Sequence, residues 1–101
     1  MIQTLINSCM KEQGLNLSEF AEYFSEGIDI KVRQHTIGNW RRGKFNPSVR
    51  ILKAAIRAYP LDDPRGRLAR GLAIAIDLPE LAGDLGTPTE VIAPEAVAEL
   101  N

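Results

Sequence analysis

The sequence contains very few of the residue types that metal sites, disulfides and most catalytic sites use. Its 101 residues include one cysteine, Cys9, and one histidine, His35. Neither a disulfide framework nor a Cys/His metal cluster can be built within one chain, and the spacings of a catalytic triad, paired catalytic carboxylates or a phosphate-binding glycine loop are absent. We therefore expect no cofactor, no metal and no enzymatic activity, with Cys9 a small buried apolar side chain.

Long apolar runs and targeting signals are also absent from the sequence. No stretch approaches the roughly 18 apolar residues of a membrane span, and the N-terminal MIQTLINSCMKEQ has neither the charged region nor the cleavage site of a signal peptide. A cytoplasmic protein that does not bind a membrane is expected. With 45% apolar residues, 101 residues are enough for one domain with a single modest core.

The net charge is small, but the charged residues are unevenly distributed. The formal net charge is −1, yet residues 31–70 carry +9, while residues 1–30 carry −4 and residues 71–101 carry −6. A basic middle between acidic ends predicts one face that meets a polyanion.

Five segments have apolar residues at the three- and four-residue spacing of amphipathic helices. They are residues 1–13, 17–24, about 33–42, 47–59 and 64–78. The predicted fold class is therefore all-α, a compact bundle of about five helices, with a loop and a brief extended piece at 25–31. From Pro79 onward the composition changes, and we divide the chain into a domain at 1–78 and an acidic tail at 79–101, either flexible or docking through a short helix at 94–100.

Residues that cap helices and residues that fill a core support these assignments. Asn16 with Glu19 has the capping-box pattern. The candidate caps of the later helices are Asn46 or Ser48 for the fourth, with Pro47 in its first turn, and Asp62 or Asp63 for the fifth, which Pro64 opens. The core side chains predicted for the third and fourth helices are Val32, Ile37, Trp40, Val49, Leu52, Ala55, Ile56 and Tyr59.

The order of these segments resembles a known family. GLNLSEFAEYFS at 14–25, followed by VRQHTIGNWRRGKFNPSVRILKAAIRAY at 32–59, is similar to the phage Cro and repressor class of helix-turn-helix domains (lambda-repressor-like). That class has an alanine in its second helix, a Thr-Ile pair and Trp-x-x-Gly in its third, and Asn-Pro-Ser before its fourth. The turn between the second and third helices is longer here than in the family.

The resemblance implies a sequence-specific, double-stranded-DNA-binding transcriptional regulator, phage-encoded or prokaryotic and associated with the nucleoid. In such domains the third helix enters the major groove. By position, Gln34, His35 and Asn39 would then read bases, and helical spacing independently puts 35 and 39 one turn apart, opposite Ile37 and Trp40. Gly38 is expected to leave this face bare for close approach to DNA. The residues expected at phosphates are Arg33, Arg41, Arg42, Lys44 and Arg50.

Domains of this class commonly bind DNA as dimers, so we expect a homodimer. The possible dimerisation element is 64–78, where the candidate side chains are Leu68, Leu72 and Ile76, with Ile74 and Leu78 as further candidates. The small residues at 71, 73 and 75 would allow close helix approach. The alternative is that this helix closes the monomer's own core.

A second function stays open at the level of sequence. The same helices can be the scaffold of a protein-interaction module, such as an antitoxin or anti-repressor, in which the tail at 79–101 binds a protein partner. The tail also has the charge needed to fold over the basic face and weaken non-specific DNA binding.

Overall fold

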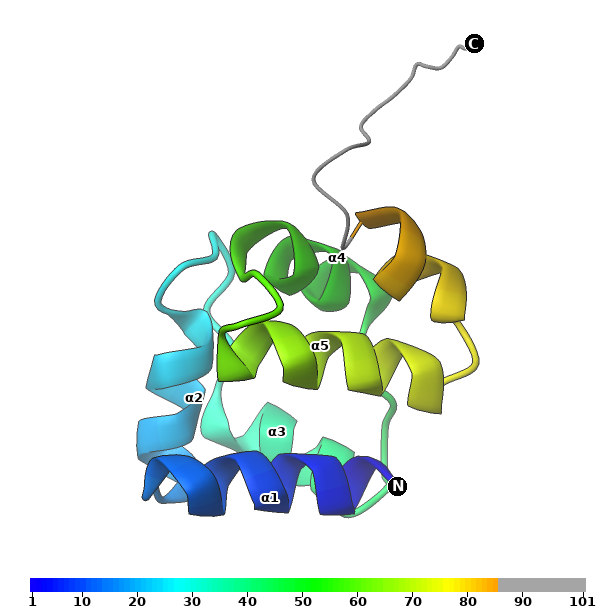
Figure 1. Cartoon of the computed structure of the whole chain (residues 1–101). Helices are drawn as coiled ribbons and strands as arrows, with labels where there is room; N and C mark the ends of the chain where they lie inside the picture. Colours follow the sequence, from blue (N-terminus) through cyan, green and yellow to red (C-terminus); the bar gives the residue numbers. More distant parts are fainter. Residues whose placement is uncertain (86–101) are drawn as a thin grey trace, which may run out of the picture.

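The computed structural model describes residues 1–85, which form six helices and no strand. They are α1 (Ile2–Gln13), α2 (Leu17–Ser25), α3 (Gln34–Arg41), α4 (Val49–Ala58), α5 (Pro64–Ala75) and the π-helix η1 (Leu81–Leu85). In Figure 1, α1 and α5 run side by side in opposite directions, α2 closes one end, and α4 packs on α5. The predicted all-α class is confirmed for this part of the chain. None of its helices is both long and apolar enough to cross a membrane.

Capping side chains begin three of the helices. Asn16 and Glu19 form the predicted capping box, in which each side chain accepts the other's backbone N–H, at 2.8 and 2.9 Å. Of the two candidates for α4 the cap is Ser48, so Pro47 precedes the cap and does not occupy the first turn. Asp63 caps α5 by accepting the N–H two residues on at 2.8 Å.

The core lies between all five α-helices and is built from the predicted apolar faces, with one exception. Cys9, Ile37 and Trp40 are buried as expected. Val49 is not, because it is the first residue of α4 and its side chain is 40% exposed. The buried apolar side chains are Ile6, Cys9, Phe20, Ala21, Phe24, Val32, Ile37, Trp40, Leu52, Ala55, Ile56, Tyr59, Leu68, Ala69, Leu72, Ala73 and Leu81.

The boundary predicted at 78/79 is too early. Leu81 belongs to the core, and η1 packs against both α4 and α5. The folded part of the chain therefore continues to residue 85, because an apolar side chain beyond Pro79 completes the cover of these two helices. Residues 86–101, including the helix predicted at 94–100, lie outside the described residues.

Two of the three side chains named on α5 as dimerisation candidates lie inside the monomer, which is what the alternative of a core-closing helix predicts. Leu68 and Leu72 are 5% and 0% exposed, and Ile76 is partly buried against the core. The physical reason is that α5 lies between α1 and α4, so its apolar residues are used within the monomer. Gly71 serves the same packing, since a Cβ there would lie 3.4 Å from the Leu5 side chain of α1.

Two side chains hold the loop between α2 and α3, which consists of turns and bends at 26–30. The Ser25 hydroxyl, at the end of α2, donates to Ala21 O and accepts the N–H of Val32 at 2.9 Å. The Tyr59 hydroxyl, at the end of α4, donates to Phe24 O at 2.7 Å and accepts the N–H of Gly27 at 2.8 Å. The Ser25 bond to Val32 joins the end of α2 to the residues before α3, and the Tyr59 bonds join the end of α4 to the end of α2.

Arg65 joins the same loop to α5. Its guanidinium lies between the rings of Tyr23 and Tyr59, 4.4 and 4.1 Å from their centroids. It also pairs with Asp63 at 2.8 Å and Glu26 at 2.9 Å, and its hydrogen bonds lower the pKa of Asp63 below the usual value. Arg65 thus neutralises acids of its own chain, and its charge is not available to an outside polyanion.

Candidate nucleic-acid interface

The outward side of α3 carries the three residues predicted to read bases. Gln34 and His35 are exposed and Asn39 is half-buried. On the opposite side, Ile37 and Trp40 are buried, and Trp40 meets the Phe24 ring edge-on with the centroids 6.4 Å apart. The aromatic contact fixes the rotation of α3, and rotation decides which polar side chains reach solvent.

Asn39 is held in place by the first residue after α3. The guanidinium of Arg42 donates to Asn39 Oδ1, while the Asn39 amide NH2 makes no hydrogen bond within residues 1–85. An amide oxygen has two lone pairs, so Asn39 keeps one acceptor site and two donors for a partner. Bidentate contact with an adenine edge needs one donor and one acceptor, which is what this side chain still offers.

Gly38 does not leave the outward face bare, contrary to the sequence-based expectation. It is buried, and a Cβ at this position would lie 3.6 Å from Leu17 Cδ2 and 3.4 Å from Arg42 Nη1. The reason is that α2 packs along this side of α3, so position 38 faces a neighbouring helix and the returning Arg42 side chain. A role for Gly38 in close approach to DNA is therefore not supported.

Four exposed cations flank α3 along the chain. Arg33 precedes the helix, Arg42 and Lys44 follow it, and Arg50 stands in the first turn of α4; all four are exposed. Both ion pairs found among residues 1–85 involve Arg65, so these four side chains are not neutralised by a described acid. Their charge is free to act on an anion from outside.

Arg41, the fifth predicted phosphate contact, differs from the other four. Its side chain is half-buried at the end of α3, and its Nε is buried without a hydrogen-bond partner among residues 1–85. Because this part of the guanidinium is covered, a phosphate can reach Arg41 only through its terminal nitrogens. We therefore expect Arg41 to contribute less than the exposed cations.

The structure adds one residue that sequence reasoning did not select. Phe45 is 59% exposed in the loop between α3 and α4, and the Lys44 ammonium lies 5.8 Å from its ring centroid. The signal in the sequence was an aromatic residue between Gly43 and Pro47, outside every helical period. An exposed aromatic beside cations can pack on a sugar, a base or an apolar protein surface.

Residues 1–85 bring together no group of three His, Cys, Asp or Glu side chains suited to a metal ion. No family model matches the chain, and no match was found among the curated proteins or the solved structures.

Proposed function

We propose that the protein is a sequence-specific regulator that binds double-stranded DNA with α3 in the major groove. The observation that carries the proposal is the combination of three polar side chains on the outward part of α3 with four exposed cations before α3, after it and at the start of α4, which no described acid neutralises. The resemblance of residues 14–25 and 32–59 to the Cro and repressor class supports the same function.

Each group has a distinct role in this proposal. Gln34, His35 and Asn39 meet base edges, where a bidentate amide contact discriminates by about 1–3 kcal/mol. Arg33, Arg42, Lys44 and Arg50 meet phosphates and position α3 without reading sequence. Four phosphate contacts in each subunit give a log–log salt slope of about −4 per subunit, and roughly twice that for a dimer.

A homodimer on two half-sites belongs to the proposal, since one α3 reads few base pairs. With Leu68 and Leu72 inside the core, the exposed apolar side chain that α5 offers is Ile74, which is 56% exposed. Sedimentation of the wild type and Ile74→Glu at the same concentrations tests this. A dimer that Ile74→Glu leaves intact would show that the subunits meet elsewhere.

The first experiment is fluorescence-anisotropy titration of a randomised duplex pool at two salt concentrations, followed by sequencing of the retained fraction. Binding that weakens with salt and enriches a two-fold symmetric motif is expected. Binding that is absent at low salt would refute the proposal.

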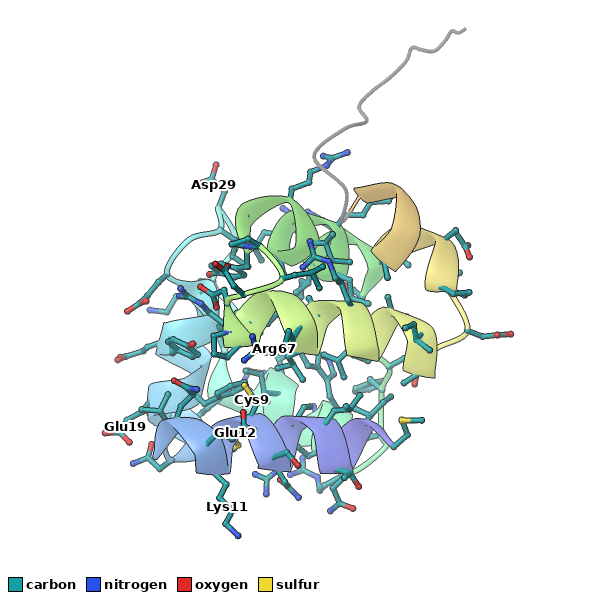
Figure 2. The ribbon with its side chains drawn as sticks, viewed as in Figure 1. Cys9, Lys11, Glu12, Glu19, Asp29 and Arg67 are labelled. Carbon is teal, nitrogen blue, oxygen red and sulfur yellow. The ribbon has the colours of Figure 1, made fainter. Side chains whose placement is uncertain are left out.

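Two substitutions and a control separate base reading from phosphate contact. Asn39→Ala is expected to relax sequence preference. Lys44→Ala is expected to weaken binding to every DNA sequence and to lower the salt slope by about one per subunit. The control is Lys11→Ala, which removes an equal charge from α1, where Figure 2 shows Lys11 projecting away from the body. If the control changes the salt slope as much as Lys44→Ala, the binding is diffuse attraction and not a contact at this site.

The exposed ring of Phe45 favours a second candidate, a protein-interaction module of the antitoxin or anti-repressor type. In that case Phe45→Ala removes partner binding, whereas Asn39→Ala and Lys44→Ala leave function intact. Regulation of a reporter promoter by the three variants distinguishes the two candidates.

A further inference from the structure

The outer side of α4 carries a row of three cations, one of which, Arg50, is also a proposed phosphate contact. Arg50, Lys53 and Arg57 follow one another at spacings of three and four residues, which places them on one face of the helix. All three are exposed, and none forms an ion pair with another described residue. This face is separate from the buried one, which holds Leu52, Ala55 and Ile56.

A groove of about 640 Å³ runs between this row and the loop at 26–33. Its apolar lining is Ile30, Val49 and Ala54, and the cations of the row stand along it. Asp29, which Figure 2 shows at the outer tip of the loop, is the one acid in its lining. The groove therefore combines uncovered apolar surface with a net positive charge.

The described chain ends beside this helix. The last described element, η1, packs against α4 and α5, and residues 86–101 follow directly from it. These sixteen residues have a maximum reach of roughly 50 Å. The ten residues of α4 extend only about 15 Å. The end of the chain can therefore reach the whole groove from its starting point.

The composition of residues 86–101 complements the groove. They contain Glu90, Glu95 and Glu99 and no lysine or arginine. Between these acids stand apolar residues, among them Ile92 and Leu100. Three acids and interspersed apolar side chains match three cations above an apolar lining.

We propose that residues 90–100 bind in the α4 groove of their own chain, with acids on the Arg50, Lys53 and Arg57 row and apolar side chains on Ile30, Val49 and Ala54. Docking requires no nucleic acid and does not depend on the proposed function. Because Arg50 belongs both to the row and to the proposed phosphate contacts, a docked segment competes with DNA at this residue.

Paramagnetic NMR on the full chain tests the proposal. A nitroxide is attached at Asn101→Cys in a Cys9→Ala background, and broadening of backbone amide signals is mapped without DNA. We expect broadening concentrated at residues 29–30 and 49–57, unchanged on dilution. Broadening that is uniform or centred elsewhere overturns the proposal, and broadening that fades on dilution assigns the occupant to a second copy and overturns it as well.

Charge reversal shows whether the cationic row is responsible. Lys53→Glu with Arg57→Glu is expected to remove the broadening at 49–57 while leaving the dispersion of the core signals unchanged. The matched control reverses two charges away from the groove, Lys11→Glu with Arg67→Glu, both exposed, and is expected to keep the broadening. Broadening that survives reversal of the row refutes the charge pairing on which the proposal rests.

Discussion

Replacing Tyr59 by phenylalanine removes one buried hydroxyl that holds the loop between α2 and α3. The hydroxyl donates to Phe24 O at 2.7 Å in a buried bond and accepts the N–H of Gly27 at 2.8 Å. Without it the Phe24 carbonyl, one of the last of α2, is left buried and unsatisfied, which destabilises by about 1–3 kcal/mol. Gly27 is exposed, so water can replace part of the second bond.

We therefore expect Tyr59→Phe to lower the free energy of unfolding by about 2 kcal/mol, the middle of that range. For a domain of this size the fall in Tm is on the order of 10 °C. Urea and thermal unfolding followed by circular dichroism measure both quantities, and amide exchange at Gly27 is expected to accelerate because the loop opens more often.

Tyr23→Phe is the matched control for this prediction. The Tyr23 ring also lies against the Arg65 guanidinium, but its hydroxyl makes no hydrogen bond within residues 1–85. Its loss is expected to change stability by less than about 0.5 kcal/mol. If Tyr59→Phe changes the free energy of unfolding by less than this limit, or if both variants lower it equally, the hydroxyl does not hold the loop and the reasoning is wrong.

Three further predictions concern packing and protonation. Gly66→Ala is expected to destabilise by at least about 2 kcal/mol in urea unfolding, because a Cβ would lie 2.0 Å from Pro60 O, whereas Gly71→Ala in the same helix changes stability far less. Gly38→Ala is expected to raise Tm by a few degrees through helix propensity, roughly 1 kcal/mol, and a lower Tm would contradict the space found beside it. Burial raises the pKa of Cys9 from 9.0 to about 11, and the nearby Glu12 carboxylate adds to the effect. Because the thiol ionises at a lower pH in the unfolded chain than in the folded one, the free energy of unfolding falls as pH rises from 9 to 11. The loss approaches about 3 kcal/mol. Urea unfolding at several pH values measures it, and the midpoint for Cys9→Ala is expected to fall less between pH 9 and 11 than that of the wild type.

Local chemistry explains the part of the fold that could be predicted. The capping box at Asn16 and the start of α5 at Pro64 depend on residues within one helical turn. They can therefore be recognised from a few consecutive residues of the sequence. The burial of Ile37 and Trp40 follows from helical periodicity, and so does the outward position of His35. The candidate site was predictable to the same extent, because its polar residues lie on one helix and share one face.

What the sequence could not determine depends on which elements lie opposite one another. Gly38 is buried because α2 covers that side of α3, and Leu68 and Leu72 are core residues because α5 is enclosed by α1 and α4. A short stretch of sequence does not show which elements will be neighbours, because contacts such as that of Tyr59 with Phe24 join residues 35 positions apart. The sequence by itself determined the five α-helices, the capping box of α2 and the polar face of α3. Only the tertiary structure decided which apolar and charged side chains are used inside the molecule, because burial and ion pairing depend on the neighbours that folding brings together.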